Sequence, residues 1–315
     1  MSNLKLINMR DVEVEPICWL WYPFIPYGKV TIIQGDPGEG KTTLVLQIIA
    51  RLTKGESIID EDESLPINVI YQTAEDGLAD TIKPRLLAAN ADCSKVLVID
   101  DSDTPLTMRD ARLEQAIIET NAKLVVLDPI QGFLGADVDM HRANEIRPIM
   151  KHISELAEKY KCAIILIGHM NKCSVGKSAY RGLGSIDFQA AARSVLIVGR
   201  IKDEPETRVV CQTKSSLAPE AKAVAFRLSE ENGFEWIGEY DVTADDLLSG
   251  TAKGTKKQTA MDFLEKLLAD GQMAQTEIIE LARQKGISDK TLRNAKDELK
   301  IKSKRVNNQW HWSFD

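Results

Sequence analysis

The sequence contains no apolar run long enough to span a membrane, which would take about 18 consecutive apolar residues. Its opening stretch, MSNLKLINMRDVEVEP, also lacks the apolar segment of a secretory signal. Cysteine is scarce: the five cysteines are scattered, odd in number and without C-x-x-C spacing, which indicates neither a disulfide framework nor a zinc site. We therefore expect a cytoplasmic protein with reduced cysteines and no membrane partner.

What the chain does contain is typical of globular proteins. Its 315 residues, 43% apolar and 28% charged, suffice for one large core and a small second domain. The net charge of −7 is unevenly distributed, because residues 255–315 hold 12 Lys and Arg against 9 Asp and Glu, about +3. If bulk charge attracts DNA anywhere, we expect it at this tail.

A phosphate-binding motif is the strongest signal in the chain. Residues 30–33 form an apolar, β-branched run typical of a buried strand, and GDPGEGKT follows as a complete G-x-x-x-x-G-K-[ST] match before a helical pattern. Glycines let backbone N–H groups face phosphate oxygens, and the helix adds its positive N-terminal end. An ordinary glycine-rich turn is the alternative. The predicted nucleotide contacts are Gly35, Asp36, Pro37, Gly38, Glu39, Gly40, Lys41, Thr42 and Thr43, with Lys41 on the β- and γ-phosphates and Thr42 on Mg²⁺.

Acids or a histidine follow three later apolar runs. They are Glu75 and Asp76 after residues 67–71, Asp128 after residues 124–127, and His169 after residues 163–167. In parallel α/β sheets, nucleotides bind at the carboxyl ends of the strands. Asp128 is therefore a candidate to hold a Mg²⁺-bound water, and His169 a candidate to contact the γ-phosphate. A turn-forming aspartate and a structural histidine are the alternatives.

The order of these patterns predicts the fold and the domains. Strands alternate with helices and are nearly all apolar, which indicates an α/β core with a mostly parallel sheet over residues 1–248. Residues 249–257, SGTAKGTKK, predict a flexible linker. Residues 258–315 contain three short helical patterns and two alternating runs joined at Asn307-Asn308, which predicts a winged helix-turn-helix.

The predicted winged helix offers a surface for duplex DNA. In that motif the third helix lies in the major groove and presents its first residues. The candidate contacts are Lys290 and Arg293 on this helix and Lys302, Lys304 and Arg305 on the wing. A protein-interaction domain is the alternative, because a charge of about +3 is modest.

The assembled motifs resemble the RecA-like hexameric ATPases, especially the plasmid RepA-type replicative helicases and related phage or mobile-element AAA ATPases. The resemblance covers residues 15 to about 240. It implies that Glu75, in YQTAEDG, polarises the attacking water, that Asp128, in LVVLDP, is the Mg²⁺-associated acid, and that His169, in IGHMNK, senses phosphate.

The resemblance also implies an arginine finger that enters the neighbouring subunit's site. Arg181, in YRGLGS, and Arg193, in AAARSV, look like the family's arginines near the subunit boundary, and Arg193 is the better candidate. Lys214, in QTKSS, is similar to the lysine beside the finger in DnaB-like enzymes, but Ser216 stands where those enzymes carry arginine. The choice among Arg181, Arg193 and Lys214 therefore stays open.

A basic, glycine-rich segment, residues 172–185, occupies the place where related rings face DNA. Lys172, Lys177 and Arg181 are the candidate contacts to single-stranded DNA, which such motors hold by backbone charge.

These observations lead to a functional expectation with two alternatives. We expect an ATPase that uses Mg²⁺, assembles as a homo-oligomeric ring, a hexamer by resemblance, and serves as a DNA helicase or translocase in replication of a phage, plasmid or integrated element. The first alternative is a nucleotide-controlled, DNA-binding regulatory protein without unwinding activity. A P-loop kinase is the second, in which Glu75 and His169 would have no obvious task.

Overall fold

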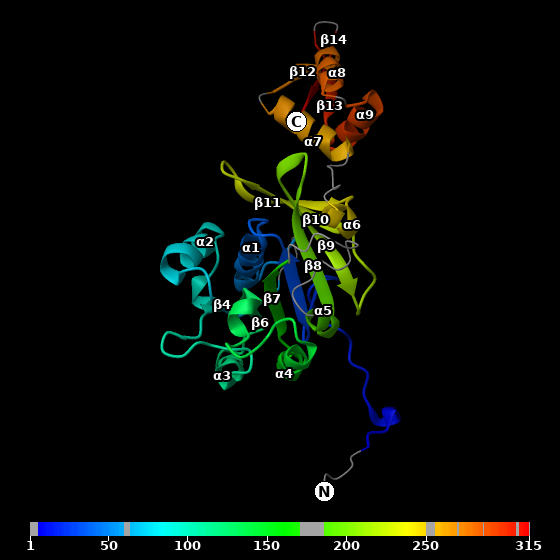
Figure 1. Cartoon of the computed structure of the whole chain (residues 1–315). Helices are drawn as coiled ribbons and strands as arrows, with labels where there is room; N and C mark the ends of the chain where they lie inside the picture. Colours follow the sequence, from blue (N-terminus) through cyan, green and yellow to red (C-terminus); the bar gives the residue numbers. More distant parts are fainter. Residues whose placement is uncertain are drawn as a thin grey trace. The chain divides into compact units, whose positions relative to one another are not determined.

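The computed structural model describes residues 6–59, 64–170, 186–249, 256–269, 271–285, 287–306 and 309–314 (Figure 1). The chain divides into two compact units, residues 1–199 with 210–221 and residues 200–209 with 222–315. Most of the predicted linker, residues 250–255, lies outside the described residues, so the predicted boundary there stays a prediction. No described helix combines the length and the apolar character that crossing a bilayer requires.

Nine strands between residues 30 and 240 pair into one sheet. Its strands, in chain order, are β3 (Val30–Gly35), β4 (Val69–Thr73), β5 (Val96–Leu97), β6 (Leu124–Asp128), β7 (Ala163–His169), β8 (Ser194–Ile201), β9 (Glu204–Ser215), β10 (Ala223–Ser229) and β11 (Gly233–Tyr240). The spatial order is β11-β10-β9-β8-β3-β7-β6-β4-β5. The six strands from β8 to β5 are parallel, whereas β10 and β11 form an antiparallel hairpin. A mostly parallel sheet, as predicted, is therefore present.

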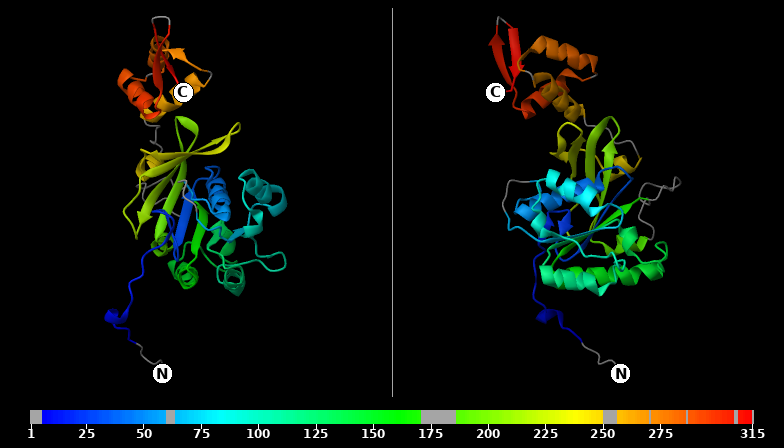
Figure 2. Two further views of the ribbon diagram at one scale, coloured as in Figure 1. Left: turned by 180° about the vertical axis from the view of Figure 1, so that it is seen from behind. Right: turned by 90° about the vertical axis from the view of Figure 1, so that its left-hand side faces the viewer.

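Helices cover both faces of the parallel strands (Figure 2). They are α1 (Lys41–Lys54), α2 (Lys83–Ala88, preceded by a π-helical turn, Leu78–Ile82), α3 (Ala111–Thr120), α4 (Ala143–Tyr160) and α5 (Ile186–Ala191), with α6 (Ala244–Ser249) after the last strand. Alternate strand residues such as Ile32 and Val125 pack with α3, α4 and α5 in one buried cluster. Figures 1 and 2 show α1 and α2 on the other face. Both faces of these strands are buried, which explains their continuous apolar sequences.

Several short strands were not predicted. β1 (Trp19–Trp21) and β2 (Ile25–Pro26) form a small antiparallel sheet within the aromatic lead-in segment. β5 ends at Leu97 although the apolar run of residues 96–99 continues, because beyond Leu97 the Gln72 side chain replaces the backbone ladder. Its Nε2 donates to the Ile99 carbonyl at 2.8 Å, and its Oε1 accepts from the Ile99 N–H at 3.0 Å.

The tail, residues 256–314, contains three helices and a small sheet. The helices are α7 (Lys256–Leu268), α8 (Gln275–Gln284) and α9 (Asp289–Glu298), and β12 (Met273–Ala274), β13 (Lys302–Val306) and β14 (Gln309–Ser313) pair in the order β12-β14-β13. Leu264, Ile278, Leu292 and Trp312 share one buried cluster. The Ser288 hydroxyl accepts from the Thr291 N–H at 3.2 Å and so caps α9. The three predicted helices and the hairpin are present, and β12 adds a strand that its two residues could not reveal in the sequence.

Candidate nucleotide-binding site

The phosphate loop joins β3 to α1, as the sequence predicted. Gly38 and Gly40 adopt positive φ angles of 79° and 87°, a left-handed conformation that favours glycine. No side chain caps the start of α1, so its first N–H groups stay available to an anion. Gly35 is needed for a different reason: a Cβ there would lie 2.2 Å from the Val198 carbonyl oxygen of β8.

Lys41 lies at the first turn of α1 and is buried, with 4% of its surface exposed. Its Nζ donates to the carbonyl oxygens of Gly35, at 2.9 Å, and Asp36, at 2.8 Å. Burial lowers the pKa of Lys41, and the nearby carboxylates, Asp128 foremost, act in the opposite direction. Its ammonium group is thus held over the concave loop by carbonyls that phosphate oxygens can replace.

Asp128, at the carboxyl end of β6, is fixed by two hydroxyl groups. Thr42 Oγ1 donates to its Oδ2 at 2.7 Å, and the Tyr71 hydroxyl donates to the same oxygen at 2.9 Å. Burial raises the pKa of Asp128, the two hydroxyl bonds lower it, and the charges of Asp76 and Glu75 raise it further. Asp128 and Thr42 therefore form the hydroxyl–carboxylate pair predicted for Mg²⁺.

The donor set fits Mg²⁺ bound together with a nucleotide. No cluster of three or more His, Cys, Asp or Glu side chains suited to a metal occurs in the described parts of the chain. Mg²⁺ usually keeps several waters and binds through one or two carboxylates plus substrate phosphates. One carboxylate, Asp128, beside one hydroxyl, Thr42, at the phosphate loop matches that pattern, with phosphates and waters left to complete the coordination.

Tyr71 was missed by sequence reasoning. It is fully buried on β4, and burial together with its bond to Asp128 raises the pKa of its hydroxyl. The signal in the sequence was a phenol directly after the aliphatic pair Val69-Ile70, since a buried tyrosine needs a partner for its hydroxyl. β4 pairs with β6 in the register Thr73↔Asp128, which explains how this tyrosine reaches the acid.

His169 and Glu75 come together with Lys41, although 128 residues separate the lysine from the histidine. His169 Nδ1 lies 3.3 Å from Lys41 Nζ, and His169 Nε2 lies 3.8 Å from Glu75 Oε2. Because a charged lysine can only donate, Nδ1 is the acceptor in this contact, and Nε2 is the ring nitrogen that faces Glu75. The predicted catalytic base, phosphate sensor and phosphate-binding lysine are thus neighbours.

The two acids after β4 differ in their surroundings. Asp76 pairs with Arg85 at 3.1 Å, and its N–H donates to Thr73 Oγ1. Glu75 has a 63% exposed side chain and faces His169 instead. Glu75 is therefore the acid of this pair that remains available to a water molecule.

Two of the three candidate trans-acting residues, Arg193 and Lys214, lie at the amino ends of the parallel strands, on the side of the sheet opposite the phosphate loop, and Arg181 lies outside the described residues. The Arg193 N–H donates to the carbonyl of Val30, the first residue of β3, and its side chain is exposed. Lys214 Nζ donates to the carbonyls of Gln189, at 2.7 Å, and Ala190, at 3.0 Å, at the end of α5. Burial and the charge of Arg193 lower the pKa of Lys214. Lys214 is thus engaged in holding α5, and Arg193 is the more accessible cation.

The predicted DNA contacts are only partly within the described structure. Lys172, Lys177 and Arg181 lie outside the described residues, as does the side chain of Lys290. The others are exposed on α9 and β13: Arg293, Lys302, Lys304 and Arg305. Lys296 Nζ, on α9, lies 5.2 Å from the centre of the Trp312 ring of β14, which ties this helix to the β13–β14 hairpin.

The fold and this site define a RecA-like P-loop nucleotide-binding protein. Residues 3–175 match the AAA_25 family, described as an AAA domain, and the chain belongs to this family. A solved structure, a KaiC-like protein from Pyrococcus horikoshii OT3, shares the fold with a TM-score of 0.51 at 17% identity, covering 70% of this chain and 99% of that one.

The chain also matches parts of longer curated proteins. A DNA repair protein RadA from Halalkalibacterium halodurans is 28% identical over 46% of this chain and 28% of its own length. Protein RecA from Solidesulfovibrio magneticus is 24% identical over 68% of this chain and 62% of its own length. Protein RecA from Agrobacterium fabrum is 24% identical over 76% and 67%, respectively. The chain thus spans less than two thirds of the first two relatives.

Proposed function

We propose that the chain binds Mg²⁺ and ATP at the phosphate loop and hydrolyses ATP there. The convergence of Glu75 and His169 on Lys41, next to the Thr42–Asp128 pair, is the observation that carries this proposal. A nucleotide-binding site without a hydrolytic role needs the lysine and the hydroxyl, but not a free carboxylate beside the γ-phosphate position.

Each side chain has a distinct task in this scheme. Lys41 exchanges the Gly35 and Asp36 carbonyls for phosphate oxygens, and Glu75 orients a water for in-line attack on the γ-phosphorus. His169, in contact with both, responds when the phosphate that Lys41 holds is lost. Mg²⁺, when bound, offsets the negative charge that develops on the phosphates.

The direct test is Glu75→Gln, with the exposed Glu206→Gln as a matched control for the loss of one carboxylate. We expect nucleotide binding to persist in Glu75→Gln while ATP turnover falls at least about 10²-fold, the usual contribution of a positioned base. Wild-type turnover in Glu75→Gln would refute the role of Glu75.

We further propose that the active form is an oligomeric ring, by resemblance a hexamer, in which Arg193 acts on the neighbouring subunit. Five residue steps separate Val30 from Gly35, and about 3.3 Å per residue puts Arg193 roughly 16 Å from its own phosphate loop along the strand. An arginine acting on phosphate from this edge must therefore serve another copy. Such residues contribute about 10³ to 10⁵ in rate in comparable systems.

A mixing experiment separates action in trans from action in cis. Glu75→Gln and Arg193→Ala subunits are each expected to be nearly inactive alone. Mixed, they form some interfaces that combine an intact Glu75 with a neighbour's intact Arg193, so part of the turnover returns. Mixtures with Arg181→Ala or Lys214→Ala identify the finger if Arg193 is not the residue, and no recovery in any mixture contradicts the shared site.

For the biological role we propose a motor that translocates on single-stranded DNA during replication of a mobile element, with Lys172, Lys177 and Arg181 as core contacts. The tail is proposed to be a winged helix whose Lys290, Arg293, Lys302, Lys304 and Arg305 face duplex DNA. The exposed cations on α9 and β13 support this role for the tail. They equally favour the alternative, a regulatory protein that reads a duplex site without unwinding it.

Strand displacement distinguishes the two roles. A forked DNA substrate with ATP and Mg²⁺ should be unwound by the motor, and binding should weaken as salt rises. Retention on one duplex sequence, without displacement of a strand, would favour the regulatory protein. Arg293→Ala should weaken duplex binding in either case and leave ATP turnover without DNA unchanged.

A further inference from the structure

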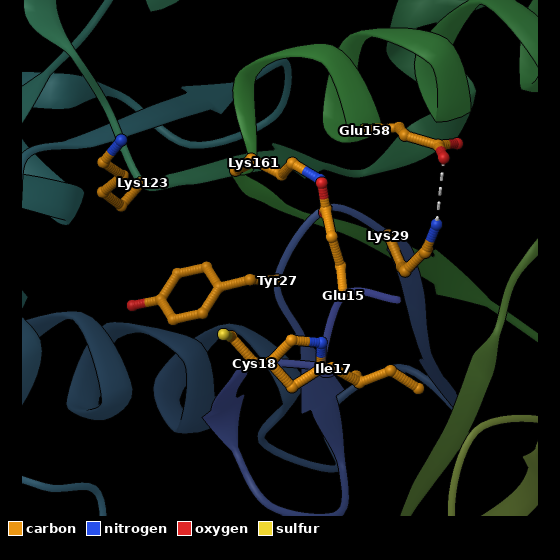
Figure 3. Close-up of a pocket in the computed structure, with 10 residues that line it drawn as sticks. Glu15, Ile17, Cys18, Tyr27, Lys29, Lys123, Glu158 and Lys161 are labelled. Carbon is orange, nitrogen blue, oxygen red and sulfur yellow. Dashed lines mark hydrogen bonds and ion pairs between the residues drawn. The ribbon is translucent and has the colours of Figure 1, made fainter. Parts of the chain in front are cut away.

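A cavity lies at the amino ends of the parallel strands, which we call the amino edge of the sheet, at the other end of β3 from the phosphate loop. Figure 3 shows the residues that line it. Its volume is about 720 Å³, within the roughly 300–1,000 Å³ of small-molecule sites. The N-terminal segment contributes Glu15, Pro16, Ile17 and Cys18 to its wall, and Tyr27 and Gly28 continue it. This pocket plays no part in the proposed hydrolysis.

The fold brings three lysines into this pocket. Lys29 directly precedes β3, Lys123 directly precedes β6, and Lys161 lies between α4 and β7. Backbone hydrogen bonds hold two of these lysines beside the start of β7. The N–H of Ile164 donates to the Lys29 carbonyl at 3.1 Å, and the N–H of Ala163 donates to the Lys123 carbonyl at 2.9 Å. Three like charges at the start of adjacent strands repel one another unless anions lie among them.

The anions that the chain itself supplies are too few. Glu158 Oε1 lies 3.6 Å from Lys29 Nζ, and Glu15 Oε2 lies 2.6 Å from Lys161 Nζ. Within the described residues Lys123 forms no ion pair. Figure 3 shows Glu15 and Lys161 pointing toward one another, Lys29 joined to Glu158, and Lys123 standing apart. Three cations against two carboxylates leave an excess of one positive charge.

Glu15 is a displaceable occupant of this group. It belongs to a segment, residues 6–18, whose described residues are all exposed, and its own side chain is 71% exposed. Exposed ion pairs contribute little to stability, so an anion with more oxygens can compete for Lys161.

We propose that this pocket binds a small phosphate-bearing ligand, whose phosphate displaces Glu15 from Lys161 and also reaches Lys123. Lysines act as point charges toward phosphate, and a phosphate dianion offers several oxygens to several ammonium groups. Ile17 and Tyr27 provide apolar surface for the body of the ligand. A nucleic acid is a poor fit, because its backbone would extend beyond the pocket along the N-terminal segment, which also carries Asp11 and Glu13.

Cys18 provides a local readout, since it lines the pocket and is exposed, whereas Cys162 and Cys211 are buried. The experiment uses the full chain with Cys93→Ser and Cys173→Ser and follows the alkylation rate of Cys18 while AMP or inorganic phosphate is added. Either probe should slow alkylation saturably. Stronger protection by AMP would indicate a ligand with an organic body, and equal protection would indicate that the pocket takes phosphate alone.

Three variants test which residues set the apparent affinity of the pocket for the probe. Lys161→Gln should weaken the apparent affinity about tenfold, the equivalent of one charge-assisted hydrogen bond. Glu15→Gln should strengthen it, because the competing carboxylate is gone, and this exposed change leaves the core intact. Lys41→Ala should leave it unchanged, because the phosphate loop is at the other edge.

The proposal fails if neither probe protects Cys18, or if Glu15→Gln weakens binding. It also fails if protection disappears in Lys41→Ala, which would trace the effect to the phosphate loop. Protection by a single-stranded oligonucleotide or an acidic peptide, with none by AMP or phosphate, would assign the surface to a macromolecule instead.

Discussion

The two ends of the parallel strands, the carboxyl edge and the amino edge of the sheet, carry opposite arrangements of charge. At the carboxyl edge a single buried lysine, Lys41, is surrounded by the carboxylates of Asp36, Glu39, Glu75 and Asp128, which all act on its pKa. At the amino edge, three lysines face two glutamates in an open pocket. One edge has a cation sequestered among anions, and the other has cations with too few anions.

This difference follows from the direction of the strands. The strands from β8 to β5 all run the same way, so residues at their carboxyl ends meet on one side of the sheet and residues that precede them meet on the other. Acids that follow β4 and β6 are brought to the phosphate loop, and lysines that precede β3 and β6 are brought to the far side. Single substitutions at the carboxyl ends of the strands can break or sharpen this contrast.

Loss of the sequestered cation should have the largest effect. Lys41→Ala removes the ammonium group from the phosphate loop, and we expect ATP turnover to fall about 10³-fold, as when a preorganised charge-stabilising group is removed. Lys151→Ala, which removes an exposed lysine from α4, is the control and should retain turnover. Steady-state ATPase assays measure both, and substantial activity in Lys41→Ala would break the contrast.

The second largest effect should come from disturbing the contact between the phosphate loop and β8. Gly35→Ala places a Cβ 2.2 Å from the Val198 carbonyl, so backbone must move, at a cost of about 3 kcal/mol or more in unfolding free energy. Gly38→Ala meets nothing within 4 Å and carries only the strain of a positive φ, about 1 kcal/mol. Denaturant unfolding of both variants checks the order, and equal destabilisation would contradict it.

Neutralising Asp128 of β6 should lower ATP turnover and raise the melting temperature. Asp128→Asn should lower Mg²⁺-dependent turnover about 10²-fold, because the buried anion beside Thr42 is lost. Burial raises the folded-state pKa of Asp128, so its charged form opposes folding at neutral pH, and Asn should raise the melting temperature there. This gain should shrink as pH falls below the folded pKa and disappear below the unfolded pKa, where Asp128 is neutral in both states. Thermal melts across pH without Mg²⁺ measure it, and a lower melting temperature at pH 7 would contradict the prediction.

The smallest effect should come from Tyr71→Phe. The hydroxyl lowers the pKa of Asp128, so its removal raises that pKa and shifts the acid limb of the turnover profile to higher pH. One lost hydrogen bond to a charged group should reduce stability by about 1–2 kcal/mol. Because the change removes only the hydroxyl, an unshifted acid limb would show that Tyr71 does not influence Asp128.

Much of the carboxyl edge was predictable from the sequence. The P-loop spacing fixes the loop chemistry, and apolar runs ending in Asp128 and His169 place those residues by strand polarity alone. Lys41 and His169 could be assigned to one site without coordinates, because all parallel strands end on the same side. The long-range distances among them required the structure.

The rest depended on tertiary packing that local patterns do not encode. Tyr71 looked like a core residue, and only the β4–β6 register brings its hydroxyl to Asp128. The lysines of the amino edge stand singly in the sequence, far apart, with no motif around them. β5 ended early because Gln72 substitutes for a strand partner, which is a side-chain contact no periodicity reveals.

Gly35 also marks where the sheet ends and the phosphate loop begins. It is the last residue of β3, pairs with His169 of β7 and leaves no room for a Cβ beside Val198 of β8. Gly38 and Gly40, in contrast, adopt positive φ angles outside any strand. We therefore expect a bound nucleotide to reshape residues 36–40 before it disturbs the base of the loop.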